Sequence, residues 1–399
     1  MSDGGGRLRD EMEDLLSQAR RPVHSRRRLR IWLGAGLPGW LRLLRDHGPS
    51  VTADHWHWVV LTTAFAACNS VLGQIQEILH GRRIRRAAFG NPIFIIGHWR
   101  SGTTWLHELL TLDERFTSPT TYECFQPCHS LLTAPGAGVR GFGLPARRPM
   151  DDVPMGWNRP QEDEFALCNL GLPSPYFQFA FPNRRPLYPE YYDLGRLPPE
   201  ARRRWSAALT GFLKQIAADR EKPFDAIVLK SPTHTFRIPV LLEIFPGARF
   251  IHIVRDPRDV FPSTVNMLAS MMHTQALHRP DLRGLDDYVL DTFDAMYRAF
   301  ENARPLLDPR RFFELRYEDL VADPVSAMRS LYEHLDLGRF AEVLPRLEEA
   351  AGKAVGYKTN RYRLGPELTR RVAERWGRVM HRYGYDLDPA AGSSTGGAG

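Results

Sequence analysis

Residues 92–110 read PIFIIGHWRSGTTWLHELL and carry the clearest structural signal in the chain. The apolar run from Ile93 to Ile96 has no polar alternation, which is typical of a buried parallel strand. Gly97 ends this run, and the apolar positions resume beyond Thr104 with helical spacing. We therefore predict a strand, a short polar loop and a helix, in that order.

The predicted loop has the chemistry of an anion site. Backbone N–H groups at a helix N-terminus are unpaired, and the helix dipole favours negative charge there. Glycine spacing from Gly97 to Gly102 matches a Walker A motif, but its lysine is missing, because Thr103 and Thr104 occupy that part of the motif. The loop is predicted to hold a phosphate group without the lysine of an NTPase. Its candidate ligands are Arg100, Ser101, Gly102, Thr103 and Thr104.

Two further strand-to-loop units follow along the chain. Residues 227–234 read IVLKSPTH, so Lys230 directly follows a buried strand. Residues 249–266 read RFIHIVRDPRDVFPSTVN, with Arg255 at the end of the strand and Ser263 about two helical turns beyond it. Strands that alternate with helices imply a parallel sheet with ligands at the carboxyl ends of its strands. All three charged loops are therefore expected to meet at one edge.

The rest of the chain predicts one α/β domain with additions at both ends. We expect a P-loop-like parallel sheet flanked by helices over residues 90–387, preceded by a helical extension over residues 31–89. Residues 1–30 are basic and have few apolar positions, which predicts a poorly ordered N-terminus with a frayed or surface-lying helix. Residues 388–399 are of low complexity and are expected to be disordered.

The most apolar part of the extension, residues 55–79, is expected to pack on the domain. Several polar residues interrupt it, so it falls short of the about 20 apolar residues that a transmembrane helix needs. A basic cluster follows directly and would suit contact with an anionic membrane surface. Its members are Arg82, Arg83, Arg85 and Arg86. We therefore expect a cytoplasmic protein, with peripheral membrane contact left open.

The composition is that of a soluble globular protein, at 43% hydrophobic and 25% charged residues. The net charge of +7 is mild and favours an anionic ligand; no basic block interleaved with aromatic residues follows residue 30, so nucleic acid is not expected. Cys124 and Cys128 are spaced like half of a metal site, but no second pair accompanies them. We expect no metal, and reduced thiols.

The acidic run from Glu162 to Glu164 has two readings. Such runs usually form a solvated surface, but this one lies between a proline turn and the apolar residues Phe165 to Leu167. It could therefore help to shape a substrate site instead. The sequence leaves both alternatives open.

Together, the three strand-to-loop units resemble the sulfotransferases that use 3′-phosphoadenosine 5′-phosphosulfate. The resemblance covers roughly residues 90–385 and is closest to the bacterial branch that also resembles tyrosylprotein sulfotransferases. It implies that the loop from Arg100 to Thr104 binds the 5′-phosphosulfate, whereas cytosolic members carry lysine in place of Arg100. It also implies that Arg255 and Ser263 bind the 3′-phosphate.

The resemblance extends to catalytic residues. Lys230 aligns with the family lysine that stabilises the leaving group. Glu123 matches the glutamate base of the tyrosylprotein branch. His234 is the second choice, because Pro232 stands where cytosolic members have their histidine base. The segment GYKTNRYRLG, near the C-terminus, resembles the loop that closes over the nucleotide, so Lys358 and Arg361 are expected to add phosphate contacts.

We therefore expect an enzyme that transfers a sulfuryl group to a hydroxyl, or less often an amine, without a metal. The aromatic content of residues 157–192 and the apolar extension suggest a small-molecule or lipid-like acceptor. A P-loop kinase or nucleotide hydrolase is one alternative, and a catalytically silent membrane-associated scaffold is another. The sequence does not indicate an oligomeric state.

Overall fold

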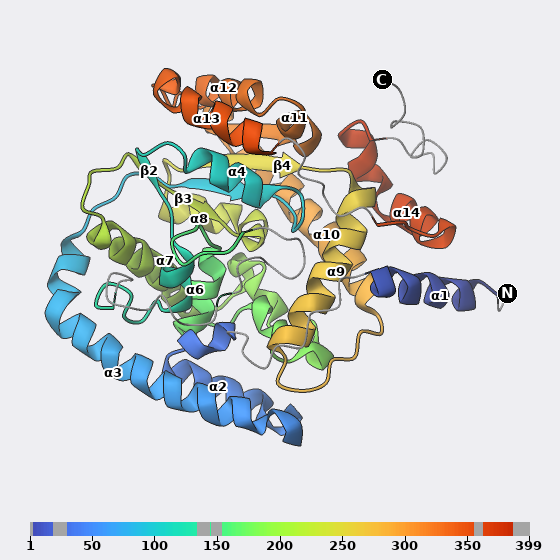
Figure 1. The fold of residues 1–399 in the computed structure, drawn as a ribbon, viewed down its shortest axis with the longest axis horizontal. Helices are drawn as coiled ribbons and strands as arrows, with labels where there is room; N and C mark the ends of the chain where they lie inside the picture. Colours follow the sequence, from blue (N-terminus) through green and yellow to red (C-terminus); the bar gives the residue numbers. More distant parts are fainter. Residues whose placement is uncertain (1–2, 19–29, 134–143, 145–153, 355–361, 386–399) are drawn as a thin grey trace.

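A five-stranded parallel sheet forms the centre of the molecule (Figure 1). The structure is a computed structural model, and it describes residues 3–18, 30–133, 144, 154–354 and 362–385. The strand order is β2-β3-β1-β4-β5. The strands are β1 (Ile93–Ile96), β2 (Phe116–Thr117), β3 (Ala226–Lys230), β4 (Arg249–Val254) and β5 (Phe312–Arg316).

Strand β1 is the middle strand of the sheet, and both of its faces are covered. Phe94 and Ile96 pack into one hydrophobic core, and Ile93 and Ile95 pack into the other. This explains why the run is apolar without alternation. Register places Ile95 opposite Lys230 on β3, so the loops after β1 and β3 leave the sheet side by side.

Helices cover both faces of this sheet (Figure 1). One face is covered by α4 (Thr103–Leu110), α11 (Tyr317–Ala322), α12 (Pro324–His334) and α13 (Phe340–Ala354). The larger core on the other face includes α6 (Asp163–Asn169), α7 (Pro199–Asp219), α8 (Ile238–Ile244), α9 (Pro257–Gln275), α10 (Leu285–Ala303) and α14 (Pro366–Arg382). Helix α5 (Thr121–Phe125) packs against α6. The predicted fold class, a P-loop-like α/β domain flanked by helices, is confirmed.

Short 3-10 helices connect several of these elements. They are η1 (Ile31–Gly34), η2 (Gly48–Ser50), η3 (Ala53–His55), η6 (Pro175–Phe179), η7 (Pro182–Arg184), η8 (Pro189–Tyr191), η9 (Leu194–Arg196), η10 (Pro232–Phe236), η11 (Arg304–Leu306) and η12 (Pro309–Arg311). Of these, η6 and η10 flank the candidate site.

The described part of the N-terminal segment is a helix, as expected, but it packs on the domain. Residues 3–18 form helix α1 (Asp3–Gln18), which packs against α14 and α9. Met12 and Leu15 are buried there. The Glu11 carboxylate accepts hydrogen bonds from the backbone N–H groups of Glu367 and Leu368, at the start of α14. Long-range capping of this kind leaves no local signal, and the apolar positions of α1 are too sparse to predict it.

Helices α2 (Leu37–His47) and α3 (Trp56–Arg86) lie in the stretch expected to be a helical extension. Helix α3 runs along the outside of the molecule (Figure 1) and contacts α2, α7 and η1. Among the described residues, Ala53–Arg86 has the length and composition to cross a membrane, with a mean hydropathy of 1.4 in its most apolar window. Only 22% of that window is buried. This is a low share for a helix of a soluble core.

Candidate functional site

The loop between β1 and α4 is shaped by two glycines in the left-handed region, Gly97 (φ +141°) and Gly102 (φ +100°). A Cβ on Gly97 would lie 2.4 Å from the carbonyl oxygen of Ile253, and one on Gly102 would lie 2.2 Å from the Tyr317 ring. Only glycine allows β4 and α11 to approach the loop this closely. The loop therefore turns tightly into the N-terminus of α4.

Hydrogen bonds fix the loop against its neighbours. Ser101 Oγ donates to the carbonyl oxygen of His98 at 2.7 Å. The Gly97 N–H donates to Thr235 Oγ1 in η10 at 2.9 Å, and Thr235 Oγ1 in turn lies 3.2 Å from the Gly97 carbonyl oxygen, to which it donates. The start of α4 is thus held in place by residues that follow β3.

The structure brings Arg100, Arg255 and Ser263 together, although up to 163 residues separate them in the chain. Arg100 Nε donates to Ser263 Oγ at 2.8 Å. Arg255 lies over the Tyr317 ring at 4.6 Å and pairs with Asp259 at 3.0 Å. The Nε of Arg255 is buried and has no hydrogen-bond partner among the described residues. A buried, unpaired guanidinium N–H is costly, and an anionic ligand would satisfy it.

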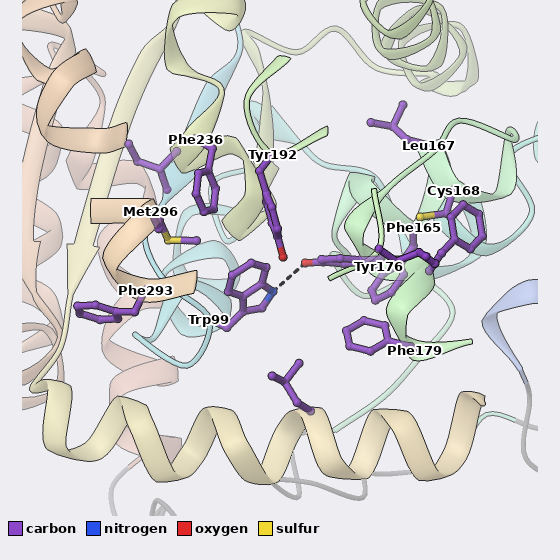
Figure 2. Close-up of a cluster of buried hydrophobic side chains, with 14 of the residues drawn as sticks. Trp99, Phe165, Leu167, Cys168, Tyr176, Phe179, Tyr192, Phe236, Phe293 and Met296 are labelled. Atoms are coloured by element: carbon purple, nitrogen blue, oxygen red, sulfur yellow. Dashed lines mark hydrogen bonds between the residues drawn. The ribbon is translucent and has the colours of Figure 1, made fainter. Parts of the chain in front are cut away.

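Lys230 is the centre of a buried polar chain. Its ammonium, on a side chain only 4% exposed, donates to Glu162 Oε1 at 2.7 Å. Glu162 Oε2 accepts from the Tyr176 hydroxyl at 2.5 Å, and this hydroxyl accepts from Trp99 Nε1 at 2.9 Å (Figure 2). Burial, together with the charge of Glu162, raises the pKa of Tyr176 well above its usual value. Tyr176 therefore stays protonated and orients the Glu162 carboxylate.

The two other acidic residues of the run, Asp163 and Glu164, are fully buried. Asp163 accepts from Ser231 Oγ at 2.8 Å and from His234 Nε2 at 2.7 Å. Burial alone would raise the pKa of Asp163, but the charge and hydrogen bonds of His234 and Ser231 hold it below its usual value. Glu164 pairs with Arg237. The run is therefore not a solvated surface: it ties α6 to the loop after β3.

Glu123, predicted as the base, has structural partners on both carboxylate oxygens. It is the third residue of α5 and forms a capping box with Thr120, whose backbone N–H donates to Glu123 Oε2 at 2.7 Å. Arg220 donates to Oε1 at 2.7 Å and to Oε2 at 3.1 Å. These hydrogen bonds explain why Glu123 is buried, and they do not require a bound sulfuryl acceptor.

His234, the second predicted base, is completely buried. Its Nε2 donates to Asp163, and its ring meets Phe94 and Trp205 edge-on. Its Nδ1 has no partner among the described residues. Lys358 and Arg361, the predicted phosphate contacts near the C-terminus, lie outside the described residues.

Sequence reasoning left Glu162 undecided and did not single out Tyr176 or Trp99. One signal could have found Glu162: a lysine that leaves a buried strand needs a carboxylate partner, because an unpaired buried ammonium is costly. The acidic run of residues 162–164 directly precedes apolar sequence and had no other predicted role, so it was a candidate for that partner. Tyr176 and Trp99 could not be paired from the sequence alone.

Beside Trp99 the structure has a small hollow with aromatic walls. It is lined by His98, Trp99, Gln178, Tyr192 and Tyr288, together with residues of α9 and α10. Over the described part of the chain, no group of three or more His, Cys, Asp and Glu side chains is arranged to hold a metal ion.

The fold and the three loops define a sulfotransferase. A profile of the family described as "Sulfotransferase family" matches residues 92–342, so the chain belongs to that family and is an enzyme of this class. The predicted family is thereby confirmed; the particular likeness to the tyrosylprotein branch stays a prediction.

Two curated relatives are similar over most of their length. The chain is 46% identical, over 357 residues, to the omega-hydroxy-beta-dihydromenaquinone-9 sulfotransferase Stf3 of Mycobacterium bovis and of Mycobacterium tuberculosis. The match covers 89% of this chain and 91% of each relative.

Solved structures support the fold. Sulfotransferase STF9 from Mycobacterium avium is 19% identical with a TM-score of 0.62, and the match covers 94% of this chain and 97% of that one. STF1 from Mycobacterium tuberculosis is 18% identical with a TM-score of 0.58, covering 92% and 98%.

Proposed function

We propose that this sulfotransferase moves the sulfuryl group of 3′-phosphoadenosine 5′-phosphosulfate to the hydroxyl of a lipid-like acceptor by in-line transfer. The observation that carries the proposal is the contact of Arg100 with Ser263 and Arg255, because the buried Nε of Arg255 has no partner among the described residues. The buried Lys230 lies on β3, the strand that pairs with β1. The acceptor class is supported by the 46% identical relatives, whose name gives a hydroxylated menaquinone as substrate. An amine acceptor is the less favoured variant.

In this proposal the donor binds along the carboxyl edge of β1 and β4. The amides of residues 101–104 and the Arg100 guanidinium hold the 5′-phosphosulfate, and Arg255 with Ser263 holds the 3′-phosphate. Charge-assisted hydrogen bonds of this kind are about twice as strong as neutral ones. The Arg100–Ser263 bond ties the two subsites together, so their spacing is fixed before the donor arrives.

Lys230 is proposed to stabilise the charge that builds on the bridging oxygen as the sulfur–oxygen bond of the donor breaks. Its position opposite Ile95 puts it next to the phosphate loop. Because its side chain is almost completely buried, little water screens its charge. The leaving phosphate keeps the electron pair of the broken bond.

For the base we propose Glu162, in preference to Glu123 and His234. Glu162 is bound to Lys230 and is oriented by the neutral Tyr176, so base and electrostatic stabiliser lie on one polar chain. Glu162 would take the proton of the acceptor hydroxyl while the acceptor oxygen bonds to sulfur. Both carboxylates are hydrogen-bonded at both oxygens, but the partners of Glu123 are Arg220 and its own helix cap, whereas those of Glu162 include Lys230.

The same proposal assigns a cytoplasmic location with contact at the membrane surface. A nucleotide donor is water-soluble, whereas a lipid-like acceptor resides in the bilayer, so the enzyme must bring the two together at the interface.

Thermal shift tests the donor assignment directly. Adenosine 3′,5′-bisphosphate at about 100 times its Kd should stabilise the protein by about 2.7 kcal/mol, whereas ATP at the same concentration should stabilise it much less. The reverse preference would favour a P-loop kinase or hydrolase and would overturn the donor assignment.

A further inference from the structure

Helix α3 buries several polar side chains and exposes several large apolar ones. Its buried face carries the polar residues Thr62, Asn69 and Gln76. Its exposed face carries large apolar side chains, of which Val60 is 67% and Ile78 is 81% exposed. A helix that faces water normally shows the opposite arrangement.

Hydrogen bonds lock this orientation. Asn69 Nδ2 donates to the carbonyl oxygens of Leu33 and Ala35 at 2.8 and 3.0 Å. Gln76 Oε1 accepts from the backbone N–H groups of Leu131 and Leu132 at 2.8 and 3.0 Å. Rotating α3 to hide its apolar side would break all four bonds and leave buried polar groups unpaired. The apolar face is therefore a fixed property of the folded protein.

The exposed apolar residues form a continuous stripe. They recur every three or four positions, which places them on one side of a helix. Ala64 and Ala67 fill the middle of the stripe, and Leu41 on the neighbouring helix α2 is also exposed. Its exposed large members on α3 are Trp56, Val60, Leu61, Val71, Ile75, Ile78 and Leu79. His57 and Gln74 are exposed polar residues on the same side. We call this set the α3 stripe; an apolar surface of this extent marks an interaction site.

A basic cluster continues the α3 stripe at its C-terminal end. Arg82, Arg83, Arg85 and Arg86 are all exposed, and only Arg85 pairs with an acidic residue of α3, namely Glu77. A helix with apolar side chains on one side and arginines at its end complements an anionic bilayer, which offers acyl chains below negatively charged headgroups. Trp56, at the other end, is of the type that favours the membrane interface.

The packing of α3 decides how it would meet the bilayer. Its inner face contacts α7, α2 and η1, so lipid cannot surround the helix. A helix of 31 residues is roughly 46 Å long at about 1.5 Å per residue, and it would lie along the membrane surface rather than cross it.

We propose that the α3 stripe, with its basic cluster, is a docking surface for an anionic lipid bilayer. The surface holds the enzyme where a lipid-like acceptor resides. Only this last link rests on the proposed function; binding to a bilayer follows from the stripe itself.

The test is flotation of the full-length protein with vesicles of phosphatidylcholine alone, or of equal parts phosphatidylcholine and phosphatidylglycerol. Wild-type protein should bind the anionic vesicles, and increasing salt should weaken this binding. The double variant Val60→Asp/Ile78→Asp should lower the partition coefficient by about tenfold or more, because two exposed apolar side chains no longer enter the lipid. Arg82→Gln/Arg86→Gln should lower binding to anionic vesicles only.

Val321→Asp is the matched control, because Val321 lies on α11, away from α3, and is 50% exposed (Figure 1). It should bind vesicles like the wild type. Equal binding by the wild type and the α3 double variant, or no binding by the wild type, would overturn the proposal. So would a wild-type dimer that the double variant converts to a monomer, because the stripe would then bind a second copy of the chain.

A second readout separates this proposal from the proposed function. Affinity for adenosine 3′,5′-bisphosphate, measured without vesicles, should be unchanged in every α3 variant. Vesicle binding without sulfuryl transfer would support the docking surface and refute the proposed function. Transfer to a dispersed acceptor without vesicle binding would support the function and refute the docking surface.

Discussion

The base assignment predicts that two hydrogen-bonded carboxylates respond differently when their charge is removed: turnover falls for the half-buried Glu162 but not for the buried Glu123. Glu162→Gln keeps the side-chain shape and one acceptor oxygen for Lys230 or Tyr176, but it cannot take a proton from the acceptor. We expect kcat to fall by about 10²- to 10⁴-fold, the usual contribution of a general base. Weakening the bond to Lys230 should also cost about 1.5 to 3 kcal/mol of stability, as for other hydrogen bonds to charged groups.

Glu123→Gln provides the comparison. The amide oxygen can still accept from the Thr120 N–H, but one of the two bonds from Arg220 is lost. Arg220 keeps its longer contact with Asp219, at 3.5 Å. We expect a stability loss of about 1 to 2 kcal/mol with kcat within about threefold of wild type. Turnover therefore separates the two variants, although both lose stability.

The assay measures initial rates of both variants at saturating donor with one acceptor. Calorimetric titration with adenosine 3′,5′-bisphosphate serves as the control for an intact donor site, and urea unfolding measures stability. His234→Asn belongs in the same series and should mainly lose stability, because His234 is buried against Asp163. An inactive Glu123→Gln variant beside an active Glu162→Gln variant would refute the reasoning and restore Glu123 as the base.

Three further predictions concern the donor site, the leaving group and pH. Arg255→Ala should remove most of the preference for the donor over adenosine 5′-phosphosulfate, by about 2 kcal/mol or about 30-fold in affinity measured calorimetrically; an unchanged preference would exclude Arg255 from the 3′-phosphate site. Lys230→Ala should lower the single-turnover rate by about 10²- to 10³-fold while donor affinity changes little, and a near-normal rate would remove Lys230 from the mechanism. Burial lowers the pKa of His98 to about 4. Between about pH 6.5 and 4 the unfolded chain then binds a proton that the folded protein does not, so stability should fall on acidification by up to about 1.4 kcal/mol per pH unit. His98→Gln should flatten this slope in urea unfolding at pH 5 and 7, and an unchanged slope would assign the effect to other groups.

The sheet's core strands were predictable because their signals are local. An apolar run with a charged residue at or soon after its end marks β1, β3 and β4 in the sequence, and Gly97 adds a turn signal after β1. Parallel topology then brings their loops to one edge. The short strand β2 has only two residues, so it leaves no comparable pattern.

The candidate site was harder to predict where partners are distant in the chain. Lys230 and Glu162 are separated by 68 residues, and Arg220 and Glu123 by 97. The sequence from Thr120 to Glu123 does have the spacing of a capping box, a local signal for a structural role that competes with the family likeness. The sequence also did not predict which side of α3 faces the domain, because this orientation depends on hydrogen bonds with residues 33, 35, 131 and 132.

The central claim is sulfuryl transfer from 3′-phosphoadenosine 5′-phosphosulfate to a lipid hydroxyl. The most direct test incubates the enzyme with this donor and a hydroxylated menaquinone in vesicles, and analyses both products by mass spectrometry. The account predicts an acceptor heavier by one SO₃ group and an equal amount of adenosine 3′,5′-bisphosphate, with both products strongly reduced for Lys230→Ala. Release of adenosine 3′,5′-bisphosphate without any sulfated acceptor, or equal product formation by Lys230→Ala, would contradict it.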